Sequence, residues 1–366
     1  MLRSIGTSIG FAALLGWATP AVFAETASSG CGRADWGSGS YTLLHEDILR
    51  TFRVHVPDAL ENDTPAPLVV MFHGWGGNED EFIGSEVIRS EADERGYILV
   101  APRGLGSGEP DQSFNSWTFS GSATGLDGDG FNPGVAGDSK AICDATLDQG
   151  ITPDYRYPSC KDQGVAQNTC SWTQCRQDDV GFVTALVAEV GKHLCVDTER
   201  LFATGSSNGG MLTWELGQNR TSAPLFRAIA PVIGLPHRGY LGPPGTPVNA
   251  DLPVILITGT RDSTVPPGAW DDPGFTTTSN DNDRFYYTGA TAITGAWARA
   301  HDCRFDPEEP ARPFKSGAPE ADCRTYCSSD PGWPRVLDCR ADMGHSYGLP
   351  WSWRLVLDFF DAHSGT

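Results

Sequence analysis

The chain has 366 residues, 39% of them hydrophobic, which is enough for a sizeable core in one large α/β domain. Its formal net charge of −20 argues against nucleic acid and other polyanions as partners, because phosphate binding requires a cationic surface. We interpret the acidity as a solvated exterior and expect a neutral or insoluble substrate.

The N-terminus has the composition of a secretory signal peptide. One positive charge is followed by an apolar run over residues 9–17 and by small residues just before Glu25. The run is too short to cross about 30 Å of hydrocarbon, which disfavours a membrane anchor. We therefore expect a signal peptide over 1–24, a catalytic domain over 25–366, and an extracellular protein with no membrane partner.

The first predicted elements are strands around one helix. Residues 51–56 alternate as an antiparallel strand does, whereas 68–72 are continuously apolar, which is typical of a central strand buried on both faces. A helix is expected over 80–95 and a strand at 97–100. This order is the beginning of an α/β pattern.

Residues 104–176 interrupt that pattern, because they are rich in Gly, Asp, Ser and Asn and have no long periodic run. Ordered loops of this length are unusual unless they are functional. We interpret the segment as a disulfide-rich insertion over the carboxyl edge of the sheet, with a peripheral decoration as an equal alternative. The sequence starting at Asp127 is similar to a calcium loop but lacks the later ligands, so a solvated turn is favoured.

Strands and helices alternate again in the second half. Asp178 and Asp179 suit the N-terminus of a helix whose apolar positions extend to Leu194 with helical spacing. Further strands are expected at 200–204, 226–233, 254–258 and around Val336, and further helices at 284–300 and 351–362. The alternation predicts a mostly parallel central sheet with helices on both faces.

Ten cysteines follow the expected cleavage point, so up to five disulfides can form in an oxidising compartment. They are Cys31, Cys143, Cys160, Cys170, Cys175, Cys195, Cys303, Cys323, Cys327 and Cys339. Zinc is the competing interpretation, but these cysteines lack the paired spacing of structural zinc sites. We expect disulfides and no metal, and the spacing leaves the connectivity open.

Ser207 is the centre of a G-x-S-x-G sequence between a predicted strand and a helix-compatible run. In such a nucleophile elbow the serine is strained, and Gly205 and Gly209 let neighbouring backbone pass without Cβ clashes. The pattern alone is weak in a chain with 43 glycines. It gains weight because an aspartate and a histidine follow it in suitable places.

Asp262 and His345 are the candidate partners of Ser207. Asp262 follows the apolar residues 254–258 in a polar turn, where it can accept the Nδ1 proton of a histidine. His345 lies in a glycine-flanked loop before the last helix and can remove the Ser207 proton. His73 is the main rival histidine, and we expect it to be structural because it ends a central strand.

The glycine-rich sequence after His73 predicts an oxyanion hole, with the backbone N–H groups of Trp75 and Asn208 as donors. Tryptophans offer planar contacts for a substrate, although they more often fill cores. The candidates are Trp75, Trp117, Trp172, Trp351 and Trp353, of which Trp75, Trp117 and Trp351 are preferred.

These motifs resemble those of secreted α/β-hydrolases of the feruloyl esterase and poly(3-hydroxybutyrate) depolymerase type, in carbohydrate esterase family one and its relatives. The resemblance runs through residues 31–33, 53–57, 67–74, 179–183 and 194–197, the Ser207 sequence, and Gly344 with His345. It implies an α/β-hydrolase fold and matches Ser207, Asp262 and His345 to the catalytic triad. The long insertion and the region between Cys303 and Cys339 depart from the pattern.

The resemblance and the motifs together favour a secreted serine esterase that cleaves feruloyl or related esters of plant polysaccharide. Such an enzyme needs no cofactor and is expected to be monomeric. Polyester depolymerisation is the alternative, with the absence of a linker and a polymer-binding domain against it. A peptidase, or an inactive binding protein with the same fold, is the alternative of another class.

Overall fold

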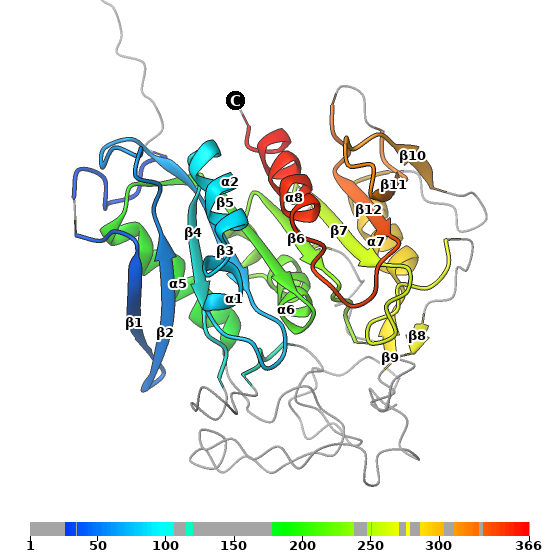
Figure 1. Ribbon diagram of the computed structural model, residues 1–366, viewed down its shortest axis with the longest axis horizontal. Helices are drawn as coiled ribbons and strands as arrows, with labels where there is room; N and C mark the ends of the chain where they lie inside the picture. The colour runs from blue at the N-terminus through cyan, green and yellow to red at the C-terminus, as the bar shows by residue number, and fades with distance from the viewer. Residues whose placement is uncertain are drawn as a thin grey trace, which may run out of the picture.

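Figure 1 shows a computed structural model of the chain. The structure describes residues 26–33, 35–105, 115–119, 178–237, 247–249, 251–270, 276–278, 286–303, 311–328 and 332–365. The expected signal peptide, most of the expected insertion, Asp127 and Trp172 lie outside these ranges. No helix within them has the length and apolar character needed to cross a bilayer.

A ten-stranded sheet runs through the middle of the described part of the chain, in the order β1-β2-β4-β3-β5-β6-β7-β12-β11-β10. Its strands are β1 (Gly39–His45), β2 (Ile48–His55), β3 (Ala66–Phe72), β4 (Ile98–Pro102), β5 (Val196–Ser206), β6 (Ala228–Val232), β7 (Val254–Gly259), β10 (Arg312–Phe314), β11 (Ala321–Thr325) and β12 (Val336–Ala341). The six strands from β4 to β12 are parallel, and two antiparallel strands follow at each end. The carboxyl ends of the parallel strands therefore share one edge, where α/β proteins bind ligands.

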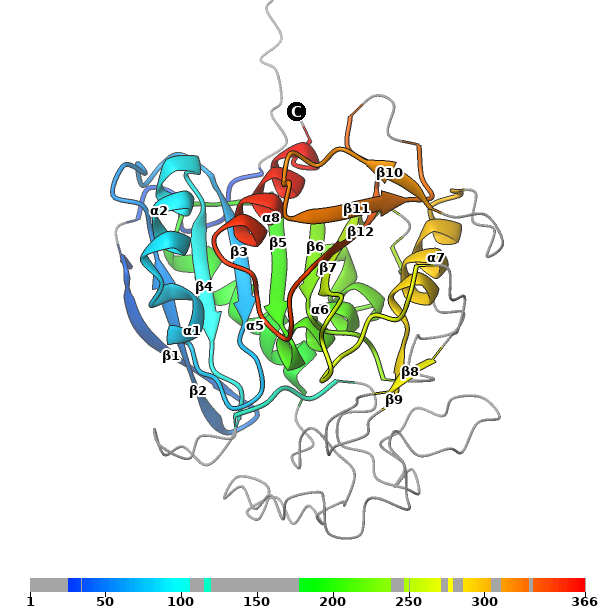
Figure 2. The ribbon, with the colours of Figure 1, turned by 45° about the vertical axis from the view of Figure 1, so that its right-hand side comes forward.

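Helices cover both faces of this sheet, as Figures 1 and 2 show. They are α1 (Asp80–Ile83), α2 (Glu86–Arg95), α5 (Asp179–His193), α6 (Asn208–Gln218), α7 (Ala290–Ala300) and α8 (Trp351–Ala362), with a short turn η1 (Ala223–Leu225) after α6. Side chains of α5, α6 and α7 form one buried cluster, and those of α1, α2 and α8 form another. The expectation of a mostly parallel sheet with helices on both faces is confirmed.

Strand β3 is continuously apolar because both of its faces pack against helices. Its residues alternate between the two clusters: Val70 and Phe72 pack on the side of α5 and α6, whereas Val69 and Met71 pack on the side of α1 and α8. Every residue of β3 is buried. A strand with a polar face would leave one helical layer without an apolar surface to pack against.

Two of the expected helices had the wrong bounds. The helix expected over 80–95 is two helices, because Gly84 ends α1 and Ser85 adopts an extended conformation. The helix expected over 284–300 starts only at Ala290, after the short strand β9 (Tyr286–Thr288), which pairs with β8 (Thr276–Thr278). The helix expected over 351–362 is confirmed, and Asp178 caps α5 by accepting from the Gly181 N–H.

Three disulfides join segments of the described chain. Cys31–Cys195 ties the N-terminal segment to the start of β5, Cys303–Cys327 joins the end of α7 to the residues after β11, and Cys323–Cys339 crosses between β11 and β12. These six sulfur atoms cannot ligate zinc as thiolates. The preference for disulfides over zinc is confirmed at these six positions, and the other four cysteines lie outside the described ranges.

Candidate active site

Ser207 stands alone between the end of β5 and the start of α6. Its backbone has φ 53° and ψ −115°, which is strained for a residue with a Cβ, at a cost of order 1–3 kcal/mol. A Cβ on Gly209 would lie 2.1 Å from the Phe72 carbonyl oxygen, so the helix start could not approach β3 with any larger residue. The Ser207 N–H donates to the Val232 carbonyl at 2.9 Å, which fixes the turn against β6.

Two hydrogen bonds connect Ser207, His345 and Asp262. His345 lies in the loop after β12, and its Nε2 is 2.9 Å from the Ser207 Oγ while its Nδ1 is 2.7 Å from the Asp262 Oδ2. Because a carboxylate can only accept, Nδ1 carries the proton and Nε2 is left to accept from the serine hydroxyl. The three side chains expected to form a triad are therefore brought together, from three different segments of the carboxyl edge.

Asp262 is held rigidly behind His345. Its side chain is fully buried, and its Oδ1 accepts the N–H groups of Thr264 and Val265, both at 2.9 Å. The turn after β7 thus aims the second oxygen, Oδ2, at the imidazole. A carboxylate held in this position fixes the orientation of the imidazole and can stabilise an imidazolium.

The peptide between Gly74 and Trp75 is oriented by its neighbours. The Gly74 carbonyl accepts from His73 Nδ1 at 2.7 Å and from the Gly77 N–H at 3.0 Å. Since the C=O and N–H of a trans peptide point in opposite directions, these bonds direct the Trp75 N–H to the other side. That N–H is one of the two donors expected in the oxyanion hole, and the other belongs to Asn208, whose N–H has no intrahelical partner as the first residue of α6.

His73 acts on this peptide as a neutral, fully buried side chain. Burial lowers the pKa of His73 to about 4, and its Nε2 accepts from the Gly104 N–H at 2.9 Å. The proton therefore resides on Nδ1, which donates to Gly74. The structural role expected for His73 takes a definite form here, because the imidazole bridges the glycine-rich loop to the end of β4.

Residues 115–117 form four hydrogen bonds with the loop after β3 and with Asn208. The Gly76 N–H donates to the Asn115 carbonyl and the Asn115 Nδ2 donates to the Gly77 carbonyl, both at 2.8 Å. The Trp117 indole donates to the His73 carbonyl at 2.9 Å, and the Trp117 N–H donates to the Asn208 Oδ1 at 2.8 Å. These contacts were not predicted from the sequence, because residues 115–117 were assigned to the insertion.

The tryptophans expected to contact substrate fall into two groups. Trp117 and Trp353 are fully buried, so a planar contact with substrate does not agree with their positions: the first packs on Phe72 and the second fills the α8 cluster. Trp75 and Trp351 are half-buried at the loop after β3 and at the start of α8. These two remain candidates for substrate contact.

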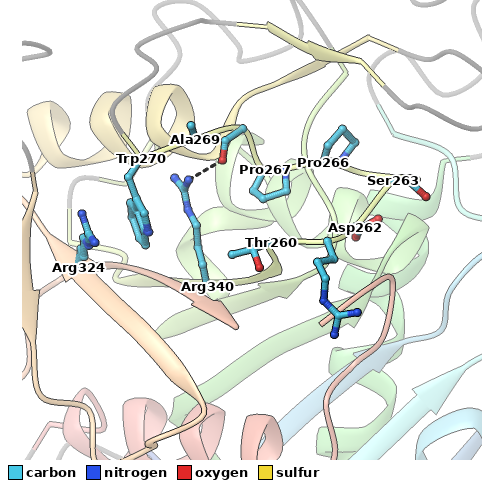
Figure 3. A pocket seen from close by; sticks show the side chains of 11 residues that line it. Thr260, Asp262, Ser263, Pro266, Pro267, Ala269, Trp270, Arg324 and Arg340 are labelled. Atoms are coloured by element: carbon cyan, nitrogen blue, oxygen red, sulfur yellow. Dashed lines mark hydrogen bonds between the residues drawn. The ribbon is translucent and has the colours of Figure 1, made fainter. Parts of the chain in front are cut away.

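A cavity of about 780 Å³ lies beside Asp262, between the loop at 260–270 and strands β11 and β12 (Figure 3). Trp270 contacts the guanidinium groups of Arg324 and Arg340, whose carbons are 4.3 and 3.7 Å from the ring centroid. Both cations are paired, since Arg340 binds Asp338 at 2.8 Å and Arg324 binds Asp322 at 2.6 Å. The cavity is therefore lined by an aromatic ring and by cations whose charge is balanced. Its volume is in the range of small-molecule sites.

A cluster of three residues away from the triad has the composition of a metal site but is better explained without a metal. Within the described ranges, His45, Glu46 and Asp178 offer ligand atoms within 4.8 Å of one another. Glu46 and Asp178 are exposed, and Asp178 already caps α5 through its carboxylate. The group is best explained as a solvated turn beside a helix start.

The strand order, the strained serine and the hydrogen-bonded trio together are those of the α/β-hydrolase fold. No family model matches the chain. Among curated proteins, it is 24% identical over 234 residues to feruloyl esterase D of Neurospora crassa and 26% identical over 216 residues to a probable feruloyl esterase C of Aspergillus clavatus. These alignments cover 63% and 59% of this chain.

The chain spans only 62% and 56% of the length of these two relatives. Among solved structures, it is similar to an acetyl xylan esterase from Aspergillus awamori, with 12% identity, a TM-score of 0.48, and coverage of 88% of this chain and 99% of that one. The chain is thus feruloyl esterase-like in sequence, as its motifs indicated.

Replacing His73 with asparagine or with glutamine tests whether its Nδ1–H orients the peptide between Gly74 and Trp75. His73→Asn keeps a donor near Gly74, whereas His73→Gln reaches toward Gly104 and loses that donor. We expect His73→Gln to lower kcat for p-nitrophenyl acetate by about 10-fold or more, and by more than His73→Asn does, because a misdirected oxyanion donor costs up to about 10²–10³-fold. Steady-state kinetics on both folded variants measures this, and equal losses would contradict the orientation argument.

Proposed function

We propose that the protein is a secreted serine hydrolase that cleaves carboxylic esters through an acyl-enzyme. One observation carries the proposal: the Ser207 hydroxyl, the His345 imidazole and the Asp262 carboxylate form a continuous hydrogen-bonded chain at a strained turn. The strained turn presents the serine oxygen, and the buried aspartate keeps the imidazole in the tautomer that can accept a proton.

The proposed reaction has two halves. The Ser207 Oγ attacks the ester carbonyl carbon while His345 Nε2 takes the hydroxyl proton, and the carbonyl oxygen becomes an oxyanion held by the Trp75 and Asn208 N–H groups. The tetrahedral intermediate then expels the alcohol, which receives the proton from His345. Water, deprotonated by His345, attacks the acyl-serine in the same way, releasing the acid and restoring the Ser207 hydroxyl. No cofactor is needed for this sequence.

For the substrate, we propose feruloyl or related hydroxycinnamoyl esters of plant cell-wall polysaccharide. The similarity to proteins named feruloyl esterase supports the aromatic acyl group. Half-buried Trp75 and Trp351 are suited to contact a planar acid, and the cavity beside Asp262 has room for part of a carbohydrate. Its balanced charge suits a neutral polyol.

Secretion is supported by the expected signal peptide and by the three disulfides of the described chain. We propose further that the protein acts as a monomer on an ester substrate, without nucleic acid or membrane as a partner. A polyester depolymerase is the alternative within the same chemistry. A peptidase would differ in cleaving peptide bonds, and an inactive binding protein would differ in showing no ester hydrolysis.

Two substrates separate the main alternatives. We expect the purified mature protein to release ferulate from methyl ferulate with a kcat/KM at least about 10-fold above that for methyl acetate, because one buried aromatic ring adds about 1–3 kcal/mol of binding. Polyhydroxybutyrate films should stay turbid under the same conditions. Clearing of the film without ferulate release would favour the depolymerase, and faster cleavage of peptides than of esters would favour the peptidase.

A further inference from the structure

We propose that Glu81 is a positioning residue for the oxyanion hole, acting through the Gly74 N–H on the peptide that carries the Trp75 N–H. The inference rests on the proposed ester hydrolysis and adds a residue to it that no sequence motif marked. Glu81 belongs to the first turn of α1, directly after the glycine-rich loop. It is therefore close in sequence to the peptide that it would hold.

The Glu81 carboxylate contacts both the loop and the nucleophile elbow. Its two oxygens accept the Gly74 N–H at 3.1 and 3.3 Å. The side chain of Ser206, the residue before the proposed nucleophile, lowers the pKa of the same carboxylate. One side chain thus links the loop after β3 to the end of β5, the two segments that supply the proposed oxyanion donors and nucleophile.

The loop is shaped to admit this carboxylate. A Cβ on Gly77 would lie 2.2 Å from the Glu81 Oε2, so only glycine at this position leaves room for the carboxyl group. Gly77 also donates its N–H to the Gly74 carbonyl. Although Glu81 as a whole residue is exposed, its carboxyl end is inserted into the turn between Gly74 and Gly77.

Gly74 needs such anchors because glycine has the widest backbone freedom of any residue. The Glu81 carboxylate holds the N–H of Gly74, while His73 and Gly77 hold its carbonyl. With both polar groups held, the two backbone torsions of Gly74 are determined, and the direction of the following N–H is determined with them. A Cβ built on Gly74 would be 3.6 Å from the Ser207 Cβ. A shift of the Gly74 backbone would therefore alter its packing against Ser207.

The charge of Glu81 is also suited to this place. Removal from bulk water raises the pKa of Glu81 to about 7, against the opposing effect of the Gly74 and Ser206 hydrogen bonds. A carboxyl group that is partly protonated near neutral pH opposes a neighbouring oxyanion less than a permanent charge would. Its acceptor oxygen remains available to the Gly74 N–H in either form.

Four variants test the proposal by kinetics on p-nitrophenyl acetate. Glu81→Ala removes the acceptor, and we expect kcat to fall about 10-fold or more with KM changed by less than about 2-fold, since the loss is in the transition state. Glu81→Gln keeps an acceptor and should stay within about 3-fold of wild type. Glu81→Asp keeps the charge but is one methylene shorter, and should resemble Glu81→Ala. Glu86→Ala, an exposed residue at the start of α2, is the matched control and should equal wild type.

A second measurement distinguishes a misoriented oxyanion donor from a general loss of order in the loop after β3. A boronic acid that forms an anionic tetrahedral adduct with the serine should lose affinity in Glu81→Ala by the same factor as kcat/KM. Unchanged kcat in Glu81→Ala, or equal losses in Glu81→Ala and Glu81→Gln, would overturn the role of Glu81 while leaving ester hydrolysis standing. Absence of hydrolysis by both wild type and Glu86→Ala would instead contradict the proposed function, and the role of Glu81 with it.

Discussion

Replacing Ser207 by alanine is expected to lower kcat for p-nitrophenyl acetate by about 10⁴-fold or more, with the fold unchanged. The substitution removes the oxygen that would form the acyl-enzyme, and within the described ranges no other hydroxyl on a strained turn is hydrogen-bonded to His345 Nε2. A residual rate above that in water should remain, since oxyanion stabilisation does not depend on the serine side chain.

Initial rates with p-nitrophenyl acetate and circular dichroism of both proteins measure the two parts of this prediction. Ser90→Ala is a suitable control, because Ser90 lies on the outer helix α2 and its hydroxyl donates to the Val87 carbonyl, away from the triad. Its kcat should equal that of wild type. If Ser207→Ala turned over at the wild-type rate, the assignment of the nucleophile would be wrong.

Replacing Asp262 by asparagine is expected to lower kcat by about 10⁴-fold, by a different route. The amide oxygen of the new side chain can still accept the Thr264 and Val265 N–H groups, so the turn should keep its shape. The amide nitrogen would then face His345 Nδ1, and because it donates, it favours the tautomer with the proton on Nε2. That tautomer cannot accept the serine proton.

The matched control for this variant is Asp342→Asn, which changes an exposed aspartate paired with Arg261 next to the same loop. It should leave kcat within about 2-fold of wild type, because exposed ion pairs contribute little. Phosphonylation of Ser207 by a fluorophosphonate gives an independent measure, and it should slow in Asp262→Asn in parallel with kcat. Normal labelling and turnover in Asp262→Asn would remove Asp262 from the proposed mechanism.

Much of the fold could be predicted wherever local patterns were strong. Strand β3 was expected from its continuous apolar run and helix α8 was expected over 351–362, and the structure contains both at these places. Strand β10 at the edge and its neighbour β11 were missed, because they are short and contain charged residues such as Asp322 and Arg324. Strands near the edge of a sheet often carry charged side chains, so their sequences need little apolar character.

The site divides in a similar way. Ser207, Asp262 and His345 could be proposed from glycine spacing, strand ends and chain order. The supporting residues could not, because Glu81 and Asn115 occur in ordinary polar sequences without a recognisable spacing. These two side chains form hydrogen bonds to backbone groups of the loop after β3. Every residue has such backbone groups, so the sequence does not indicate which of them a distant side chain will contact.

By itself, the amino-acid sequence determined the alternation of strands and helices, the strained serine turn and the residue types for acyl transfer. These features depend on backbone torsions and burial patterns, which act between near neighbours in the chain. Only the tertiary structure decided that Ser207 and His345, 138 residues apart, meet at 2.9 Å, that Trp117 is buried behind the loop, and that Glu81 inserts into it. Such contacts exist only after the whole sheet has assembled, because strand order decides which loops share its carboxyl edge.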